Sequence, residues 1–190
     1  MHSDLVSGLR PAFLFTLIFA ALLGIAYPLV ITGAGQLLFP AQANGSLVRD
    51  GAGQLRGSAL LGQNFAAARY FQGRPSAAGN GYDPLASGGS NMGPASKKLI
   101  DRVRADQTRL GANAPADLLL ASGSGLDPDI SPAAARFQVA RVAKVRGIAA
   151  ERIRQLVEAN VRPPLLGIIG APRVNVLALN LALDRQGGAR

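Results

Sequence analysis

The longest apolar run of the chain lies close to its N-terminus. No charged residue occurs between Pro11 and Phe39, and the segment 12–31 (AFLFTLIFAALLGIAYPLVI) is almost wholly apolar. At 1.5 Å of rise per residue, roughly 20 helical residues cover about 30 Å, the hydrocarbon thickness of a bilayer. A helix also satisfies every backbone group within the segment, as lipid requires. The pattern therefore predicts one transmembrane helix, residues 12–35, which Pro28 kinks in its last turns.

A cleaved signal peptide is the main alternative interpretation of this run. Arg10 supplies a short positive region, and residues 24–26 form a small-x-small pattern whose cleavage would leave a mature N-terminus at Tyr27. Against cleavage, the apolar run continues as far as Ile31, beyond the expected end of a signal peptide's apolar region. The anchor is therefore favoured. The short tail, residues 1–11, carries Arg10, which favours a cytoplasmic N-terminus.

The remaining part of the chain, residues 36–190, is long enough for one compact domain. The formal net charge of +9 falls on this part, because Asp4 and Arg10 cancel before the anchor. The positive-inside rule counts short flanking segments, so a basic domain does not prevent export. We expect an α+β protein: one N-terminal transmembrane helix followed by a single small mixed α/β extracytoplasmic domain, periplasmic to a cell inner membrane.

The first part of this domain is patterned as strands and loops. Residues 46–49 and 54–56 flank Asp50-Gly51-Ala52-Gly53, which predicts a β-hairpin, since tight hairpin turns need positive φ angles. Residues 70–75 indicate a short strand that ends in a turn. The segment 76–94 is rich in Gly, Ser and Asn, which is typical of a linker or of an ordered loop.

Helical patterns dominate the second part of the domain. The spacing predicts a helix over 95–110, ended by Gly111, and a short buried strand over 117–121. Ser131-Pro132 is a strong helix start, so a helix over 132–146 is expected. A further helix is expected over 149–160. The residues expected to face the core are Phe137, Ala140 and Val145 in the first of these two helices, and Ile153, Leu156 and Val157 in the second.

The C-terminal segment 174–183 fits two periodicities. Leu177 and Leu181 make an i,i+4 stripe, which favours a helix capped by Asn175. Strict alternation of apolar residues over the same segment favours a strand. We lean towards the helix, and periodicity alone does not decide.

The chain holds few side chains for catalysis. Its only histidine is His2, and it has no cysteine, so Ser-His-Asp triads, Cys-His pairs and His-based zinc sites lack their parts. Carboxylate chemistry stays open in principle through Asp127 and Asp129. They lie just before a predicted helix, where acidic residues meet the helix dipole favourably, so a structural role is preferred. No metal site is expected.

Three features bear on phosphate or nucleic acid. Gly57 and Gly62 have P-loop spacing, but Gln63 and Asn64 stand where Lys and Ser or Thr belong. Two Ser/Gly runs present either anion-binding nests or structural turns, and turns are favoured. The basic helices lack interleaved aromatic residues, so no nucleic acid is expected as a partner. The two Ser/Gly runs are Ser87-Gly88-Gly89-Ser90 and Ser122-Gly123-Ser124-Gly125.

Five stretches, in order, resemble the C-subunit family of the Kdp potassium-transporting ATPase, a bacterial P-type pump complex. The resemblance covers nearly the whole chain, anchor included. The stretches are 57–63 (GSALLGQ), 70–76 (YFQGRPS), 87–94 (SGGSNMGP), 121–135 (ASGSGLDPDISPAAA) and 172–181 (PRVNVLALNL).

The resemblance implies a non-catalytic accessory subunit that assembles or stabilises the pump and raises the ATP affinity of its ATP-hydrolysing subunit. The implied partners are a potassium-channel-like subunit, the ATP-hydrolysing subunit, a small single-span subunit and the bilayer. ATP and Mg²⁺ belong to the ATPase subunit and K⁺ is the cargo, so no cofactor of its own is expected. A membrane-anchored nucleotide-binding module that uses residues 122–125 is the alternative.

The family motifs also supply candidate residues for an interface or for anion and nucleotide contact. Two positions depart from the usual pattern of the family, which has His where this chain has Asp129 and Glu where it has Ala178. Any role of that His therefore does not carry over. The candidates are Gln63, Arg74, Ser87, Gly88, Gly89, Ser90, Asn91, Ser122, Gly123, Ser124, Gly125 and Asp127.

Overall fold

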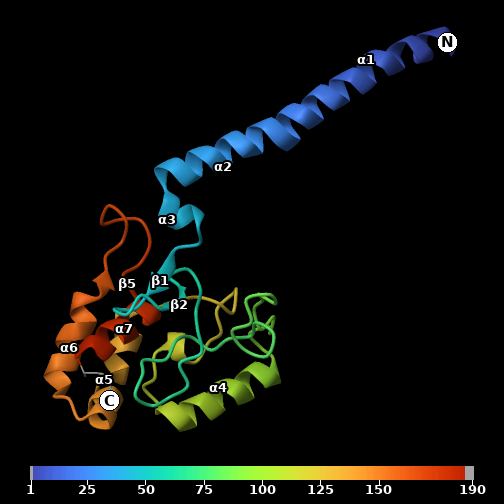
Figure 1. Cartoon of the computed structure of the whole chain (residues 1–190). Coiled ribbons are helices and arrows are strands. Elements are labelled where there is room, and N and C mark those ends of the chain that lie inside the picture. Colours follow the sequence, from blue (N-terminus) through green and yellow to red (C-terminus); the bar gives the residue numbers. More distant parts are fainter. Residues whose placement is uncertain (1, 187–190) are drawn as a thin grey trace. The chain divides into compact units, whose positions relative to one another are not determined.

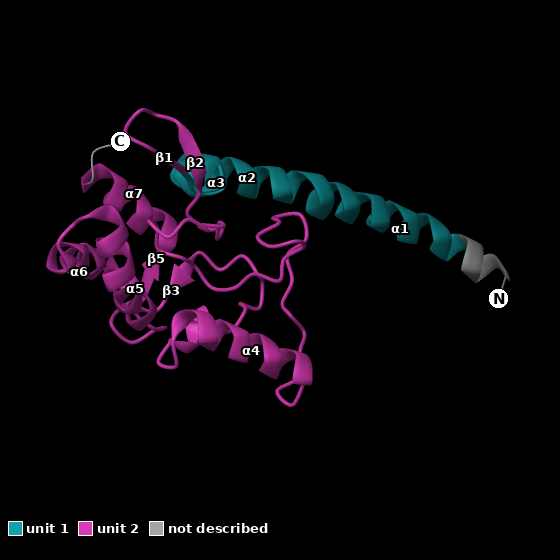
Figure 2. Ribbon diagram, turned by 90° about the horizontal axis from the view of Figure 1, so that it is seen from below, with its two compact units in different colours: residues 1–47 teal, residues 48–190 magenta. Residues whose placement is uncertain are grey.

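The computed structural model describes residues 2–186, with side chains from Ser7 onward. The chain forms two compact units, residues 1–47 and 48–190, which Figure 2 distinguishes by colour. The class is the predicted one: a long apolar N-terminal helix followed by a small mixed α/β domain.

The first unit is almost entirely helical. It comprises α1 (His2–Ala21), the π-helical segment η1 (Leu22–Ala26), α2 (Tyr27–Leu38) and the short α3 (Pro40–Ala43). The stretch Ser7–Leu38 is long and apolar enough to cross a membrane, and none of its most apolar window is buried within the chain. This fits a membrane-anchored protein.

Pro28 explains the irregular turn within this long helix. Proline has no N–H, and its ring crowds the carbonyl four residues earlier. The helix accommodates it by widening just before the proline, so that the Tyr27 N–H donates to the Leu22 carbonyl five residues back. The disturbance expected from Pro28 is therefore present as a π-helical segment.

The described residues of the second unit form two small sheets and four α-helices. Its elements are β1 (Leu47–Arg49), β2 (Leu55–Ser58), α4 (Lys97–Leu110), the 3₁₀ turn η2 (Ala116–Leu118), β3 (Asp129–Ile130), α5 (Pro132–Arg146), α6 (Ala150–Ala159), β4 (Val161–Arg162), β5 (Arg173–Asn175) and α7 (Val176–Gln186). β1 pairs with β2, and β5 lies between β3 and β4, antiparallel to both. In both ribbon views α4 lies apart from α6 within this unit (Figures 1 and 2).

The β1–β2 hairpin confirms the prediction from its turn residues. The Asp50 carboxylate accepts hydrogen bonds from the Ala52 and Gln54 N–H groups, both at 2.9 Å, and Gly53 adopts a positive φ of 78°. Burial opposes the charge, but these amides and the Arg56 guanidinium together lower the pKa of Asp50. The turn is therefore held by an ionised aspartate.

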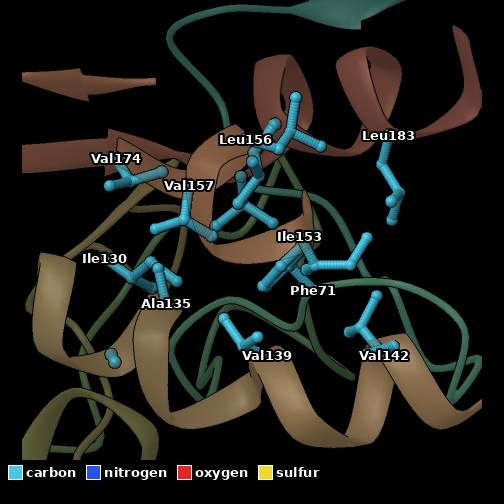
Figure 3. Close-up of a cluster of buried hydrophobic side chains, with 14 of the residues drawn as sticks. Phe71, Ile130, Ala135, Val139, Val142, Ile153, Leu156, Val157, Val174 and Leu183 are labelled. Carbon is cyan, nitrogen blue, oxygen red and sulfur yellow. The ribbon is translucent and has the colours of Figure 1, made fainter. Parts of the chain in front are cut away.

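The hydrophobic core lies between α5, α6 and α7. Ile153, Val157 and Leu183 are fully buried there, and Phe71 reaches the same cluster from an irregular segment (Figure 3). The prediction that Ile153, Leu156 and Val157 face inward on the helix 149–160 is thus confirmed. At roughly 1.5–3 kcal/mol for each fully buried large apolar side chain, this cluster supplies the main stabilisation of the unit.

Caps place the helix ends where the sequence predicts them. The Ser131 side chain accepts a hydrogen bond from the Ala134 N–H at 3.1 Å, so α5 starts at Pro132. The Asn175 side chain accepts from the Ala178 N–H at 3.0 Å. This cap decides the open question over 174–183: the segment is the helix α7, preceded by the short strand β5.

Residues 70–75 are not a strand. The Phe71 N–H donates to the Asn180 side-chain oxygen at 2.9 Å, and the Asn180 amide donates to the Phe71 carbonyl at 2.9 Å. Gln138 makes the same pair of bonds with Gln72, at 2.8 and 3.0 Å. Buried backbone groups need partners, and here two side-chain amides take the place of a neighbouring strand. The predicted strand was therefore wrong.

The prediction of a strand over 117–121 was also wrong. The segment forms the 3₁₀ turn η2, because the Leu118 and Leu119 N–H groups donate to carbonyls three residues earlier. The Asp117 carboxylate accepts a hydrogen bond from the Ser131 N–H at 2.7 Å, which fixes this turn beside the start of α5.

The core-facing side of α5 was misassigned in part. Phe137 is half-buried against the core, but Ala140 and Val145 are exposed. The buried face instead carries small residues and one amide, which a search for large apolar side chains misses. It comprises Ala134, Ala135, Gln138, Val139, Val142 and Ala143.

Candidate functional site

Two Ser/Gly loops far apart in the sequence lie against each other. The Gly88 N–H donates to the Ser124 carbonyl at 2.8 Å, and the Ser87 hydroxyl donates to the same carbonyl at 3.0 Å. We call residues 87–91 and 122–125 the Ser/Gly loop pair. The segment 76–94 is therefore an ordered loop rather than a linker.

The two loops of the pair need glycine where their backbones come into contact. Gly125 has a φ of 68°, and a Cβ there would lie 2.6 Å from the Ala78 nitrogen and 2.7 Å from the Gly88 oxygen. A Cβ on Gly89 would lie 3.0 Å from the Gly123 oxygen. A side chain at either contact would push the loops apart.

Ser76 connects the 76–94 loop to Gly125 of the other Ser/Gly loop. Its hydroxyl donates to the Gly125 carbonyl at 2.6 Å and accepts from the Tyr82 N–H at 2.7 Å. The Tyr82 hydroxyl in turn donates to the Arg74 carbonyl at 2.5 Å. Burial raises the pKa of the Tyr82 phenol. The motif YFQGRPS is thus tied to the motif ASGSGLDP through Ser76.

Arg74 and Asp127 form an ion pair beside the loop pair. An Arg74 terminal nitrogen lies 3.1 Å from Asp127 Oδ2, and both side chains are about 30% exposed, at 27% and 31%. The other oxygen of Asp127 accepts from the Asp129 N–H at 3.0 Å. The nearby charges therefore neutralise each other. Arg74 Nε is buried without a hydrogen-bond partner.

Asp129 takes a separate structural role. Its carboxylate lies 3.1 Å from Arg173 Nε and accepts from the Asn175 amide at 3.1 Å. Asp127 and Asp129 thus hold different partners. We assign both carboxylates to fixing the start of β3 and the entry to α7.

A shallow cleft of about 360 Å³ opens beside the loop pair. Six of the candidate residues line it, and the others except Gln63 lie in the adjoining loop segments. Gly88 and Gly89 lie in the loop contact and Gly125 beneath it, Ser90 is half-buried, and Asn91 is exposed with a φ of 49°. The candidates that line the cleft are Arg74, Ser87, Ser122, Gly123, Ser124 and Asp127.

Gln63 belongs to a different surface. Its amide donates to the Arg56 carbonyl at 2.9 Å and fills the space above Gly57. The neighbouring Gly62 N–H donates to the Leu126 carbonyl at 2.7 Å. The P-loop-like glycines therefore accommodate a side chain and a backbone contact.

A larger cleft of about 630 Å³, which sequence reasoning missed, lies on the Gln63 side. Its most buried cation is Arg146, which bonds Asp184 at 2.7 Å and lies over the Tyr70 ring at 4.9 Å. Its charged residues are four arginines and two aspartates, and each aspartate pairs with one arginine, Asp50 with Arg56 and Asp184 with Arg146. They are Asp50, Arg56, Arg69, Arg146, Asp184 and Arg185.

Sequence reasoning also missed the buried amides Asn180 and Gln138, which are 1% and 3% exposed. A signal for them exists: each is the polar residue on the otherwise apolar, core-facing side of its helix. Among the described residues, no three His, Cys, Asp or Glu side chains gather in a way that suits a metal ion.

Comparison with known proteins places the chain in a family. The family model described as "KdpC: K+-transporting ATPase, c chain" matches residues 9–185. The chain belongs to the KdpC family. The matched range contains both Ser/Gly loops, Arg74, Asp127 and Asn175.

Several KdpC relatives match over nearly their full length. The chain is 57% identical over 187 residues to the potassium-transporting ATPase KdpC subunit of Caulobacter vibrioides (strain NA1000 / CB15N), covering 96% of this chain and 95% of that protein. It is 54% identical to the protein of that name from Allorhizobium ampelinum, covering 98% and 100%. For the Myxococcus xanthus protein the identity is 51%, covering 99% and 90%.

Proposed function

We propose that this KdpC-family chain is a non-catalytic accessory subunit of a K⁺-transporting ATPase complex, which it assembles and stabilises. Its partners are a potassium-channel-like subunit, the ATP-hydrolysing subunit, a small single-span subunit and the lipid bilayer. The family and the long apolar helix support this role. ATP and Mg²⁺ serve the partner ATPase subunit, and K⁺ is the transported ion.

One observation carries the proposal: the Ser/Gly loops bind each other. A phosphate nest needs several backbone N–H groups that point at the anion. Here the Gly88 N–H donates to Ser124, the Gly125 N–H donates to the Ser122 carbonyl at 3.2 Å, and the Leu126 N–H donates to the Ser124 hydroxyl at 3.1 Å. Donors already used in this way favour a rigid surface for protein contact over an anion site.

We place residues 1–11 in the cytoplasm, the helix 12–35 across the inner membrane and the domain 36–190 in the periplasm. The short tail with Arg10 supports this orientation. The domain then lies at the face where potassium enters the pump, and we infer that it caps this entrance. The loop pair and the Arg74–Asp127 edge are the surface we assign to subunit contact.

A subunit whose domain is periplasmic can raise the ATP affinity of its partner without contacting the nucleotide. ATP is on the other side of the membrane from a periplasmic domain. Stabilising the pump conformation that binds ATP would raise the apparent affinity through a population shift. The subunit is then a catalytic chaperone that works by coupling.

The alternative is a nucleotide-binding regulatory module centred on Ser122–Gly125. Two observations favour it: the cleft of about 360 Å³ beside this loop, and the unpartnered Arg74 Nε. This module requires the domain to face the cytoplasm and the full chain, purified alone, to bind ATP.

Deleting the gene for this chain from cells that produce the other subunits tests the proposal. We expect the remaining subunits to fail to co-purify and K⁺-stimulated ATP hydrolysis to be lost, with both restored by supplying the full chain. A complex that assembles and hydrolyses ATP with unchanged affinity in its absence overturns the proposal. Saturable ATP binding by the full chain alone would support the nucleotide-binding module instead.

A further inference from the structure

The loop that joins β4 to β5 has a rigid tip. Leu165 and Ile169 exchange two backbone hydrogen bonds, at 3.0 and 2.9 Å. In the three-residue loop between them, Leu166 and Gly167 both have positive φ, 54° and 77°, and the Ile168 N–H also donates to the Leu165 carbonyl at 3.2 Å. Leucine rarely adopts this conformation. The tip therefore holds its side chains in fixed directions.

This tip displays a concentrated group of aliphatic side chains. Leu165, Leu166, Ile168 and Ile169 are 65%, 82%, 83% and 57% exposed. Figure 1 shows the loop in orange, projecting from the domain between α6 and β5. Contiguous exposed apolar residues of this kind mark an interaction site with a protein or a membrane.

The base of the same loop is basic. The last pair of the β4–β5 ladder places Arg162 opposite Arg173, and both are exposed. Asp129 neutralises only one of the two, through its contact of 3.1 Å with Arg173. Like charges directly opposite each other on antiparallel strands are unfavourable unless an anion lies between them. The base therefore suits a phosphate group.

We propose that residues 161–173 form a hairpin that docks on a lipid bilayer, with the aliphatic tip in the boundary between headgroups and acyl chains and the arginine pair at lipid phosphates. The apolar tip lies farther from the domain than the arginine pair. In a membrane the apolar layer likewise lies deeper than the anionic headgroups, so the two arrangements match.

The position of the membrane helix in the chain also favours the bilayer. The segment 39–47, which links the end of α2 to the second unit, spans at most about 30 Å even when fully extended. The domain is thus confined near a membrane surface at all times. This argument rests on the proposed membrane anchorage.

A single-cysteine label tests the inference directly, because the chain has no cysteine of its own. We would place an environment-sensitive nitrobenzoxadiazole probe on Ile168→Cys of the full chain in phosphatidylcholine nanodiscs, with and without phosphatidylglycerol. Leu85→Cys, at a position 96% exposed in another loop, is the matched control. The quencher is doxyl-labelled phosphatidylcholine.

We expect the probe at position 168 to emit at shorter wavelength than the probe at position 85 and to be quenched by the doxyl lipid. Phosphatidylglycerol should increase this quenching, and Arg162→Gln should remove the increase. Equal emission and no quenching at both positions overturn the inference. Shielding at position 168 only after the other pump subunits are added also overturns it, because the tip then binds a protein.

These outcomes are distinguishable from a failure of the proposed function. Loss of the chain from the nanodisc fraction would show that the anchorage itself is wrong. Normal nanodisc retention and pump assembly without lipid quenching at position 168 would remove the docking hairpin alone.

Discussion

The side chain of Asn180 binds both backbone polar groups of Phe71, each at 2.9 Å. Asn180 is 1% exposed and Phe71 is fully buried, so water cannot replace either bond. One amide on α7 therefore holds the YFQGRPS segment to the core, and the position of Arg74 and Ser76 depends on it. The candidate contact surface is thus connected to the C-terminal helix.

Replacing this amide should destabilise the domain strongly. Asn180→Ala leaves the Phe71 N–H and carbonyl buried without partners, at about 1–3 kcal/mol each. We expect a total loss of about 2–6 kcal/mol, which corresponds to a fall in Tm of roughly 5–20 °C. Thermal unfolding of the full chain in detergent micelles measures it. Asn113→Ala, at an exposed turn position, is the control and should change Tm little.

Gly125→Ala should disrupt the loop pair, because the new Cβ would lie 2.6 Å from the Ala78 nitrogen at a backbone conformation that alanine disfavours. We expect a loss of roughly 1–3 kcal/mol and weaker co-purification with the other pump subunits. Gly123→Ala in the same loop is the control, since nothing lies within 4 Å of its Cβ. Equal behaviour of the two variants would show that the loop contact is unimportant.

Tyr82 should make stability fall at high pH. Burial raises the pKa of its phenol above the ordinary value of 10.0, so the folded state keeps the proton that the unfolded chain releases. This contribution is complete below the unfolded pKa and is lost as the pH rises towards the folded pKa.

Comparing the wild-type chain with Tyr82→Phe isolates this effect. At about pH 8 the variant should be less stable by about 1 kcal/mol, because it lacks the bond to the Arg74 carbonyl. Above about pH 10 the difference in Tm should shrink, since only the wild-type loses its phenolic proton. A difference that stays constant with pH would contradict the assignment.

The Arg74–Asp127 ion pair should contribute modestly to the free energy of unfolding. Asp127→Asn leaves a half-buried guanidinium without its counter-ion, and we expect a loss of about 1 kcal/mol. Asp101→Asn on exposed α4 is the control. If the Asp127 variant lowers Tm no more than the control yet prevents co-purification, the pair acts in subunit contact alone.

Local sequence signals predicted the parts of this fold that are themselves local. The Asp50 turn, the Ser131-Pro132 start of α5 and the Asn175 cap of α7 each depend on residues within a few positions. The segment 70–75 was mistaken for a strand because its partners, Gln138 and Asn180, are far along the chain. No periodicity reveals a backbone bonded to distant amides.

In the candidate site, too, local features could be predicted from the sequence and contacts between distant residues could not. Its glycines and serines stand out in the sequence as turns or nests, and both interpretations remain open from composition alone. The bond from Gly88 to Ser124, which joins two loops more than thirty positions apart, favours the turns. The exposed tip at 165–169 has no local signal either, since an apolar run reads equally well as a buried segment.

The side of the membrane that holds the domain tests the central claim most directly. We would label Leu85→Cys, the only cysteine in that variant, with a membrane-impermeant maleimide in spheroplasts and in inverted inner-membrane vesicles. An accessory subunit at the potassium entrance predicts labelling in intact spheroplasts and protection in inverted vesicles. Labelling in inverted vesicles alone would place the domain on the ATP side and contradict the account.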